Sequence, residues 1–237
     1  MPLHLAALHA WSGTREIGRG NLDEGLTLHH LLAEAFGPGT LQPFRLMVAP
    51  RAVRGTLYAY SARPADALRD AARSVIGPTE ASILPLDRLR SVPRPPESWR
   101  ADMRLGFDLK ARPVVRLSSD LETDTQRFSK GAELDAFLAE TLRNDKSRPR
   151  EDVYLDWLVT RLAPVAELER DRTRMHSFRR SRGTRGGRSV EGPDVVFHGT
   201  LTIRDRHGFA DMLARETGRH RAYGYGMLLL RPLRRRA

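Results

Sequence analysis

The chain has 237 residues, of which 40% are hydrophobic and none is cysteine, so it can bury one large core or two small ones but forms no disulfides or thiolate metal sites. No apolar run approaches the ~20 residues that span a bilayer, and the N-terminus lacks the features of a signal peptide, so we expect a soluble cytoplasmic protein. The net charge of +11 fits a polyanionic partner only if the basic residues are clustered, because an even excess can also reflect solubility or coding bias.

The first ninety residues alternate strand and helix patterns in the order β-α-β-β-α-β. Apolar side chains recur at helical spacing up to Phe36, where Gly37 and Pro38 end the pattern. The predicted strands are 3–11, 44–49, 56–61 and 82–86, and the predicted helices are 26–36 and 64–75. This order predicts a ferredoxin-like domain, in which helices cover one face of a four-stranded sheet.

The same order recurs after a proline-rich segment, with one extra helix. The predicted strands are 103–117, 173–178, 195–203 and 227–230, and the predicted helices are 132–142, 152–162 and 206–215. The sequence therefore predicts an α+β fold of two tandem ferredoxin-like (RRM-like) domains. We expect an N-terminal domain at 1–90, a linker at 91–100 and a C-terminal domain at 101–237.

Two short segments carry the excess positive charge. Residues 170–188 hold eight arginines and one carboxylate, and residues 219–236 hold six arginines and no carboxylate. Guanidinium groups bind phosphates bidentately and stack on bases, so this clustering favours nucleic-acid binding. In the first segment we expect a flexible hairpin tip that follows an RNA backbone, the alternative being a disordered basic loop. The candidate RNA-binding residues there are Arg179, Arg180, Arg182, Arg185 and Arg188.

Glycines, bases and tyrosines alternate just before the last predicted strand. Glycine can adopt positive φ and lets main-chain N–H groups approach an anion closely. We therefore expect a solvent-exposed phosphate cradle with stacking faces, the alternative being a glycine-rich turn that only feeds a buried strand. The candidate RNA-binding residues are Gly218, Arg219, His220, Arg221, Tyr223, Gly224, Tyr225 and Gly226.

Motifs along nearly the whole chain resemble the CasE-type CRISPR repeat endoribonucleases. They are DEGLTLHHLLAEAF at 23–36, FRL at 44–46, FDLKARP at 107–113, FHGTLTI at 197–203 and GRHRAYGYG at 218–226. That family cuts the repeat stem-loop of precursor CRISPR RNA without a metal, in type I-E and some type IV systems, and keeps its product. The resemblance implies an endoribonuclease without cofactors. Its implied partners are CRISPR repeat RNA, as precursor and mature crRNA, and other subunits of an effector complex.

Cleavage of this kind needs groups that take up and release a proton, because the ribose 2′-OH attacks the adjacent phosphate and leaves a 2′,3′-cyclic phosphate. Histidine can serve both roles near neutral pH. His29 matches the histidine of the family's opening helix and lies at the margin of an apolar stripe. The family commonly has a tyrosine three residues earlier, where this chain has Leu26. We expect His30, or an arginine such as Arg15 or Arg19, to assist. The candidate catalytic residues are His29, His30 and Arg19.

Two other functions remain open at this point. A noncatalytic RNA-binding subunit of a CRISPR ribonucleoprotein has the same fold and basic segments, and in it Leu26 marks lost chemistry. A nucleotide-binding enzyme is disfavoured because the chain has no P-loop and no GxGxxG entry to a helix. No metal site is expected, since the remaining histidines show no repeated metal-ligand spacing.

Overall fold

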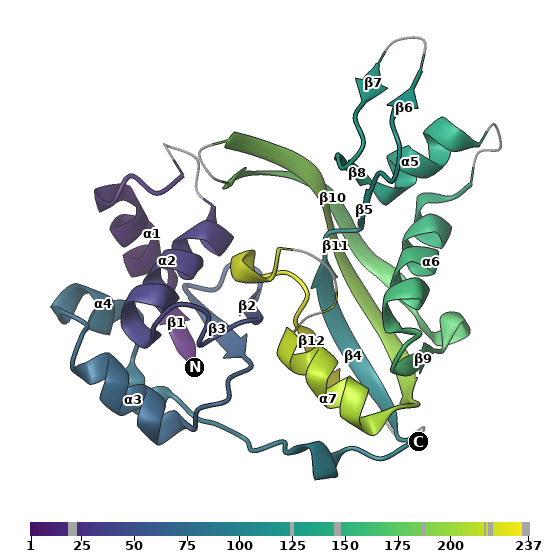
Figure 1. Ribbon diagram of the computed structural model, residues 1–237. Helices are drawn as coiled ribbons and strands as arrows, with labels where there is room; N and C mark the ends of the chain where they lie inside the picture. Colours follow the sequence, from purple (N-terminus) through teal and green to yellow (C-terminus); the bar gives the residue numbers. More distant parts are fainter. Residues whose placement is uncertain are drawn as a thin grey trace.

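The computed structural model describes residues 1–18, 23–123, 126–144, 148–185, 188–215, 217 and 220–233. Its two larger hydrophobic clusters comprise side chains from residues 3–89 and from residues 99–228. The two halves of the chain lie side by side (Figure 1). We propose that they are the domains expected at 1–90 and 101–237. None of the described helices has the length and apolarity needed to cross a membrane.

The N-terminal half contains an antiparallel sheet in the order β1-β3-β2. Its elements are β1 (Pro2–His4), α1 (Leu5–Thr14), α2 (Glu24–Phe36), β2 (Phe44–Val48), β3 (Arg54–Ala59), α3 (Ala65–Arg73), α4 (Pro78–Ile83) and the 3-10 turn η1 (Leu86–Arg88). The predicted helices at 26–36 and 64–75 are thus confirmed as α2 and α3. The central β3 pairs with both neighbours, as the middle strand of a split βαβ unit does.

Two predicted strands of this half are wrong. The strand expected at 3–11 stops at His4, and α1 follows because Leu5, Leu8 and Trp11 share one buried helical face. The strand expected at 82–86 is the end of α4 and a 3-10 turn. Ile83, Leu84 and Leu86 are buried, but Ile83 ends a helix that begins with a proline in its first turn and Leu86 opens the 3-10 turn. The described part of this sheet therefore lacks the fourth strand.

The C-terminal half forms the larger sheet, in the order β10-β11-β4-β12, with all neighbours antiparallel and β9 added beside β11. Its elements are the 3-10 turn η2 (Pro96–Ser98), β4 (Arg104–Ala111), β5 (Val114–Arg116), β6 (Leu121–Glu122), β7 (Arg127–Phe128), β8 (Glu133–Asp135), α5 (Ala136–Arg143), α6 (Arg150–Leu162), β9 (Ala166–Leu168), η3 (Arg170–Arg172), β10 (Arg174–Arg185), β11 (Arg188–Ile203), α7 (Arg206–Arg215), η4 (Arg221–Tyr223) and β12 (Leu228–Arg231). The first strand, β4, lies between the last strand and β11, which completes a ferredoxin-like sheet.

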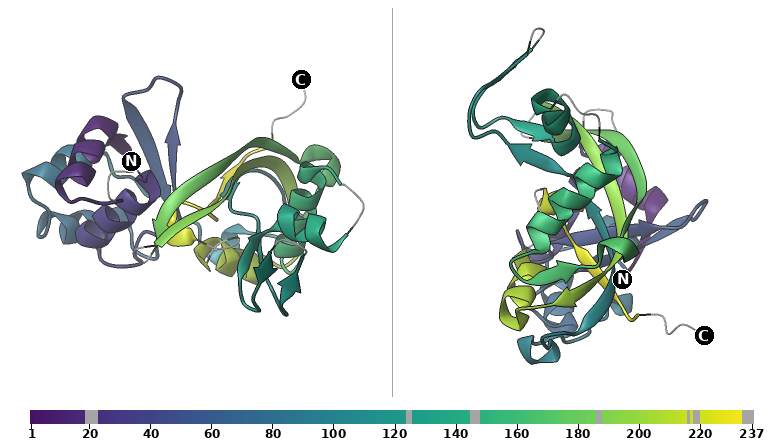
Figure 2. Two further views of the ribbon diagram at one scale, coloured as in Figure 1. Left: turned by 90° about the horizontal axis from the view of Figure 1, so that it is seen from above. Right: turned by 90° about the vertical axis from the view of Figure 1, so that its right-hand side faces the viewer.

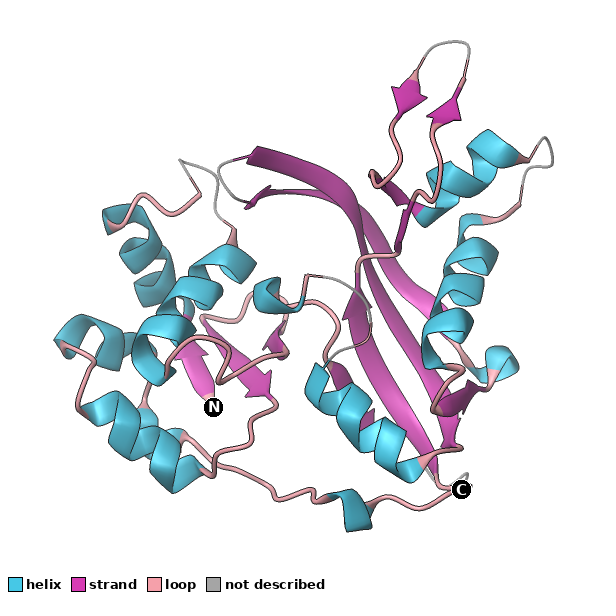
Figure 3. Cartoon of the chain, in the orientation of Figure 1, coloured by secondary structure: helices cyan, strands magenta, loops and turns pink. Residues whose placement is uncertain are grey.

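Several boundaries in this half differ from the prediction. The strand expected at 103–117 is interrupted before Pro113, and β5 leaves the sheet to pair with β8. The helix expected at 132–142 begins at Ala136, where Asp135 accepts a hydrogen bond from the Phe137 N–H and caps the helix. The hairpin expected to have a flexible tip is instead paired from Arg174 opposite His198 to Arg185 opposite Arg188. Figure 3 shows this long two-stranded ribbon.

The two faces of the larger sheet differ in character. Alternate side chains such as Leu109, Phe197 and Leu201 are fully buried in a core shared with α6 and α7. The opposite side, which we call the polar face, carries Asp108, Lys110, Asp194, Val196, His198, Leu229 and Arg231 by the strand registers. Figure 2 shows the curvature of this sheet.

Contacts across the two halves fix their arrangement. Arg45 of β2 lies 3.3 Å from Asp108 of β4, and both side chains are buried. The Tyr60 hydroxyl donates to the Leu228 carbonyl at 2.8 Å, and burial raises the pKa of this phenol to about 12.

Candidate functional site

Helix α2 sets the position of His29. Asp23 caps the helix by accepting a hydrogen bond from the Leu26 N–H at 3.0 Å. Thr27 and Leu28 are buried on the core side, so His29 lies at the edge of the buried face and is half-buried. Its ring centroid is 5.3 Å from that of Tyr223. The helix therefore places an imidazole against the glycine-rich segment of the other half of the chain.

The glycine-rich segment docks closely on α2. The carbonyl oxygen of Tyr223 lies only 2.4 Å from the point that a Cβ on Gly25 would occupy, so the contact requires glycine in the helix. Gly224 has a φ of +81° and packs against the ring of Phe44 in β2. This segment thus joins the two halves next to His29.

The expected exposure of the glycine-rich segment is wrong over its last residues. Gly224, Tyr225 and Gly226 are buried, and the Gly226 N–H donates to the Lys110 carbonyl at 2.8 Å. The apolar strand that follows requires this burial, because Met227 is buried and Leu228 begins β12 and belongs to the core. The role of these residues in RNA binding stays a prediction.

A cleft of about 290 Å³ lies between the first turn of α2 and the end of the polar face. One wall is the start of the helix, and the other carries cationic side chains from β4 and the β10–β11 hairpin. The lining includes Asp23, Glu24, Gly25, Lys110, Arg112, Arg179, Arg182, Asp194, Tyr223 and Tyr225. The N-terminus of a helix and a set of cations both favour an anion, so this is where a negatively charged ligand fits best.

Asp194 organises two of the cations in this cleft. Its carboxylate is 3% exposed, accepts a hydrogen bond from Arg179 Nε at 2.8 Å and lies 3.5 Å from Lys110 Nζ. The hydrogen bond to Asp194 raises the pKa of Arg179, whereas burial lowers the pKa of Lys110. The ammonium of Lys110 also lies 4.8 Å above the ring of Tyr225. Two cations are thus held in place at the cleft wall.

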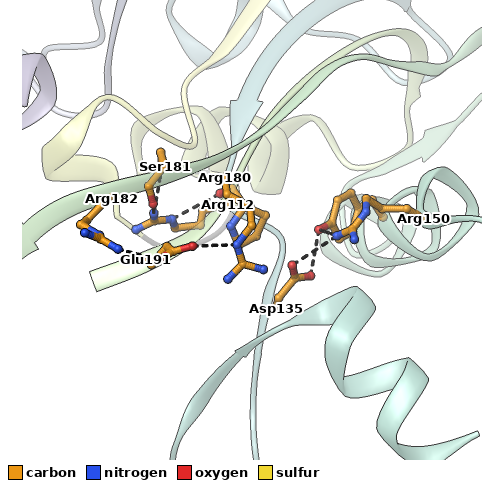
Figure 4. A network of polar contacts seen from close by, with 9 residues as sticks. Arg112, Asp135, Arg150, Arg180, Ser181, Arg182 and Glu191 are labelled. Carbon is orange, nitrogen blue, oxygen red and sulfur yellow. Dashed lines mark hydrogen bonds and ion pairs between the residues drawn. The ribbon is translucent and has the colours of Figure 1, made fainter. Parts of the chain in front are cut away.

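Arg112 supplies a third cation, from the residue directly after β4. Its Nη2 donates to the carbonyl and hydroxyl oxygens of Ser181 at 2.9 and 3.0 Å, and its Nε donates to the Pro193 carbonyl at 3.3 Å (Figure 4). Its Nη1 is buried and has no hydrogen-bond partner within the part of the chain that the structure describes. A buried guanidinium N–H without an acceptor is costly, so this atom is suited to an anionic oxygen that enters the cleft.

Sequence reasoning did not select Lys110 or Arg112. The signal that could have found them is the alternation of Asp108, Lys110 and Arg112 with buried apolar residues along one strand. This period of two predicts that the strand has one polar and one apolar face. The segment was predicted only as a strand, without an assignment of its two faces.

The other predicted site residues that the structure describes are spread over several elements. Arg180 and Arg182 share Glu191, at 2.9 and 3.3 Å (Figure 4). His30 and Arg221 are exposed, and His220 lies 2.7 Å from Glu133.

Arg15, considered near the N-terminal loop, is not among the described residues that line the cleft. Arg15 is paired with Glu34 at 2.9 Å and with Glu80 at 3.3 Å. Arg19, Gly218 and Arg219 lie outside the described residues, as do the side chains of Arg185 and Arg188.

Three solved structures share this fold at low sequence identity. The CRISPR endoribonuclease Cse3 bound to a 19-nt RNA has a TM-score of 0.59 and 19% identity, covering 91% of this chain and 93% of that chain. The CRISPR-associated protein Cas6e from Escherichia coli K-12 has a TM-score of 0.55 and 19% identity, covering 88% and 92%. A chain of a CRISPR RNA-guided surveillance complex in a pre-nicking state has a TM-score of 0.52 and 15% identity, covering 86% and 88%.

These likenesses confirm the α+β class and the tandem ferredoxin-like arrangement. A search of curated proteins found no match. A family model described as CRISPR associated protein matches residues 3–232, which is nearly the whole chain. The chain therefore belongs to this family of CRISPR-associated proteins.

Proposed function

We propose that the protein is a metal-independent endoribonuclease that cleaves the repeat stem-loop of precursor CRISPR RNA and retains the product. The observation that carries this proposal is the contact of the His29 ring with Tyr223, which lines a cleft that also holds four cationic side chains and a helix N-terminus. Family membership supports a role in a CRISPR system, and the shared fold with an RNA-bound CRISPR endoribonuclease supports RNA as the ligand.

The cleft suits an RNA phosphate next to the reacting bond. Lys110, Arg112 and Arg179 supply positive charge, and Arg112 Nη1 is the donor best placed to bind an anionic oxygen. Arg182 also lines the cleft, and Arg180 shares its partner Glu191; both arginine side chains are more than half exposed, so they can contact the backbone of the stem.

The reaction needs only groups of the RNA and of this chain. The 2′-oxygen bonds to phosphorus while the bond to the 5′-oxygen breaks, one proton leaves the 2′-hydroxyl, and another reaches the departing oxygen. His29 transfers one of these protons. Lys110 and Arg112 stabilise the extra negative charge on the phosphorane. The products are a 2′,3′-cyclic phosphate and a 5′-hydroxyl.

Tyr223 takes the place of the tyrosine that the family has at the position of Leu26. Its ring contacts that of His29, and the residue lines the cleft, so a phenol reaches the site from the C-terminal half. It thereby acts as the second polar group at the reacting phosphate, as a hydrogen-bond donor or a proton carrier.

Cleavage of labelled repeat RNA in EDTA tests the proposal. The wild-type protein should cut with EDTA present, because the attacking hydroxyl belongs to the RNA. His29→Ala should bind the RNA nearly as well and cut it about 10²–10⁴ times more slowly. His207→Ala, at an exposed histidine of α7, is the matched control, and His30→Ala tests whether the adjacent histidine assists.

The outcomes separate the two candidate functions. A wild-type protein that binds the repeat without cutting it is the noncatalytic RNA-binding subunit. A His29→Ala variant that cuts at the wild-type rate refutes the assignment of His29. Tyr223→Phe should slow cutting and leave binding intact if the phenol participates.

Retention of the product is tested on the same reaction. Because the hairpin contacts are proposed to lie along the stem and not at the broken bond, the processed RNA should stay bound and migrate with the protein in a native gel. The proposed partner is a CRISPR effector complex, since a chain of a surveillance complex has this fold. Release of the product at the rate of cutting would contradict this part.

A further inference from the structure

Two histidine rings are stacked on the polar face of the larger sheet, away from the cleft. The rings of His176 and His198 are nearly parallel, with 18° between their planes and 4.1 Å between their centroids. His198 covers one side of the His176 ring, yet His176 is exposed as a residue, so solvent reaches the rest of the ring. An exposed flat ring supported from behind is a surface on which a nucleobase can stack.

A β-bulge brings the two rings together. Met175 of β10 lies opposite Phe197 of β11, and Ser177 lies opposite Val196, so His176 is the extra residue between two paired positions. A bulge redirects a side chain without changing the strand on either side. Here it turns His176 toward His198 on the polar face, while Met175 packs against the core.

A buried carboxylate holds the stack in place. Asp108 is 2% exposed and lies 2.9 Å from His198 Nε2. The same carboxylate accepts a hydrogen bond from Arg231 at 2.6 Å and pairs with Arg45. Burial lowers the pKa of His198, which favours the neutral ring as a donor to Asp108. Asp108 thus fixes a ring and a half-exposed arginine side by side.

We propose that this part of the polar face is a binding subsite for unpaired nucleotides of the RNA. One base stacks on the exposed side of His176, and a neighbouring phosphate pairs with Arg231, whose side chain is 50% exposed. Arg174, which is exposed and opposite His198 in the register, supplies a second cation. Stacking on a side chain requires an unpaired base, so the ligand is single-stranded RNA and not the repeat stem.

The subsite lies on the same side of the larger sheet as Asp194, which lines the cleft. Asp194 and His198 are four residues apart on β11, so both face the same side of the sheet, about 13 Å from each other at ~3.3 Å per residue. An RNA strand that leaves the cleft can therefore run along the polar face to the stack. The inference rests on the proposed function, because the stem-loop must occupy the cleft for its flanking strand to reach His176.

Binding of two matched RNAs tests the proposal. One is the repeat hairpin ending at the base of its stem, and the other carries ten unpaired adenosines at one end, in separate 5′ and 3′ versions. A 2′-deoxy nucleotide at the cut position keeps both intact during fluorescence anisotropy. For one version, the wild-type protein should bind the extended RNA roughly five- to tenfold more tightly than the blunt hairpin.

Variants of His176 test whether its exposed ring causes this gain in affinity. His176→Ala should bind both RNAs with the affinity of the blunt hairpin and should cut a cleavable blunt hairpin at the wild-type rate. His176→Tyr should keep the gain, because a phenol ring also stacks. His207→Ala, at an exposed histidine of α7, is the matched control and should behave as wild-type.

Failure of the subsite is distinguishable from failure of the proposed function. A wild-type protein without any gain from either extension, or a His176→Ala variant with the full gain, overturns the subsite. Loss of hairpin binding and cutting by the wild-type protein overturns the proposed function instead. In that case, binding of the isolated ten-adenosine strand tests the subsite separately. Tighter binding by the wild-type protein than by His176→Ala supports the subsite, and equal binding overturns it.

Discussion

Two carboxylates of the β10–β11 hairpin each hold two cations, but in different surroundings. Asp194 is 3% exposed and holds Arg179 and Lys110 at the cleft. The side chain of Glu191 is 43% exposed and holds Arg180 and Arg182 at the surface. A buried carboxylate loses much of its hydration and depends on its partners, whereas an exposed one exchanges them for water at little cost.

This difference in burial suits the two groups of cations to different roles. The cations around Asp194 are fixed in direction, as a site that stabilises a reacting phosphate requires. The arginines around Glu191 can leave it for a phosphate, as general contact with an RNA backbone requires. Under the proposed function, the cations around Asp194 serve the chemistry and those around Glu191 serve RNA affinity, and the following experiments compare the two groups.

The largest expected difference is in stability. Asp194→Asn should lower the free energy of unfolding by about 2–3 kcal/mol, less than the loss of a wholly buried pair because the Arg179 side chain is 70% exposed. Glu191→Gln should change it by less than ~0.5 kcal/mol. Urea unfolding followed by circular dichroism measures both. Equal effects of the two variants would refute the contrast.

A second variant tests whether the cleft depends on the docked glycine-rich segment. Gly25→Ala should cost roughly 2 kcal/mol, because its Cβ would meet the backbone of Tyr223, and should also slow RNA cutting. Gly13→Ala in α1 is the matched control, since its Cβ meets nothing within 4 Å, and it should be neutral or slightly stabilising. Thermal unfolding and a cleavage assay report the two effects separately. A Gly25→Ala variant as active as wild-type would show that docking is dispensable.

Arg180 and Arg182, the exposed arginines around Glu191, should matter most for the salt dependence of RNA binding. Replacing Arg180 and Arg182 by glutamine should reduce the slope of log affinity against log salt by about 1–2, because each phosphate contact contributes ~0.7–0.9. Arg204→Gln removes an exposed arginine that pairs with Asp102 and Glu167 at the opposite end of β11 from Glu191, and it should leave the slope unchanged. Titrations at several salt concentrations measure the slope. An unaltered slope in the double variant would show that the RNA stem does not contact these two arginines.

The smallest expected effect concerns pH. Burial lowers the pKa of His198 in the folded protein, so between that pKa and the ordinary value of about 6.5 the unfolded chain binds more protons. This contribution to stability is complete above about pH 6.5 and is lost as the pH falls toward the folded pKa. His198→Gln should therefore make unfolding less sensitive to pH between 7 and 5.5. His207→Gln, at an exposed site, should keep the wild-type profile.

Local patterns predicted most of the fold but not its interruptions. The apolar spacing of α2 and the order of strands in the C-terminal half are set by short-range periodicity and are confirmed. The arginine-rich segment was expected to be a flexible hairpin tip because of its composition, which is rich in arginine and glycine. Its pairing depends on partners such as Glu191, opposite Arg182 on the next strand, and such pairs are not visible in a single segment.

The candidate site was predictable only in its local part. His29 follows from a helix and a motif, whereas its neighbour Tyr223 comes from the far end of the chain. Lys110 and Arg112 become candidate site residues only because they line a cleft between the two halves. Such juxtapositions depend on how the halves pack, which neither periodicity nor composition encodes locally.

The docking of the glycine-rich segment on α2 has a consequence for the order of synthesis. Nearly two hundred residues separate His29 from Tyr223. At the ~5–20 residues per second of translation, the ribosome needs roughly 10–40 s to make that stretch. The helix that carries His29 leaves the ribosome long before its partner exists. A nascent chain thus holds an unfinished site, and any RNA-cutting activity of this protein can begin only once almost the entire chain has been translated.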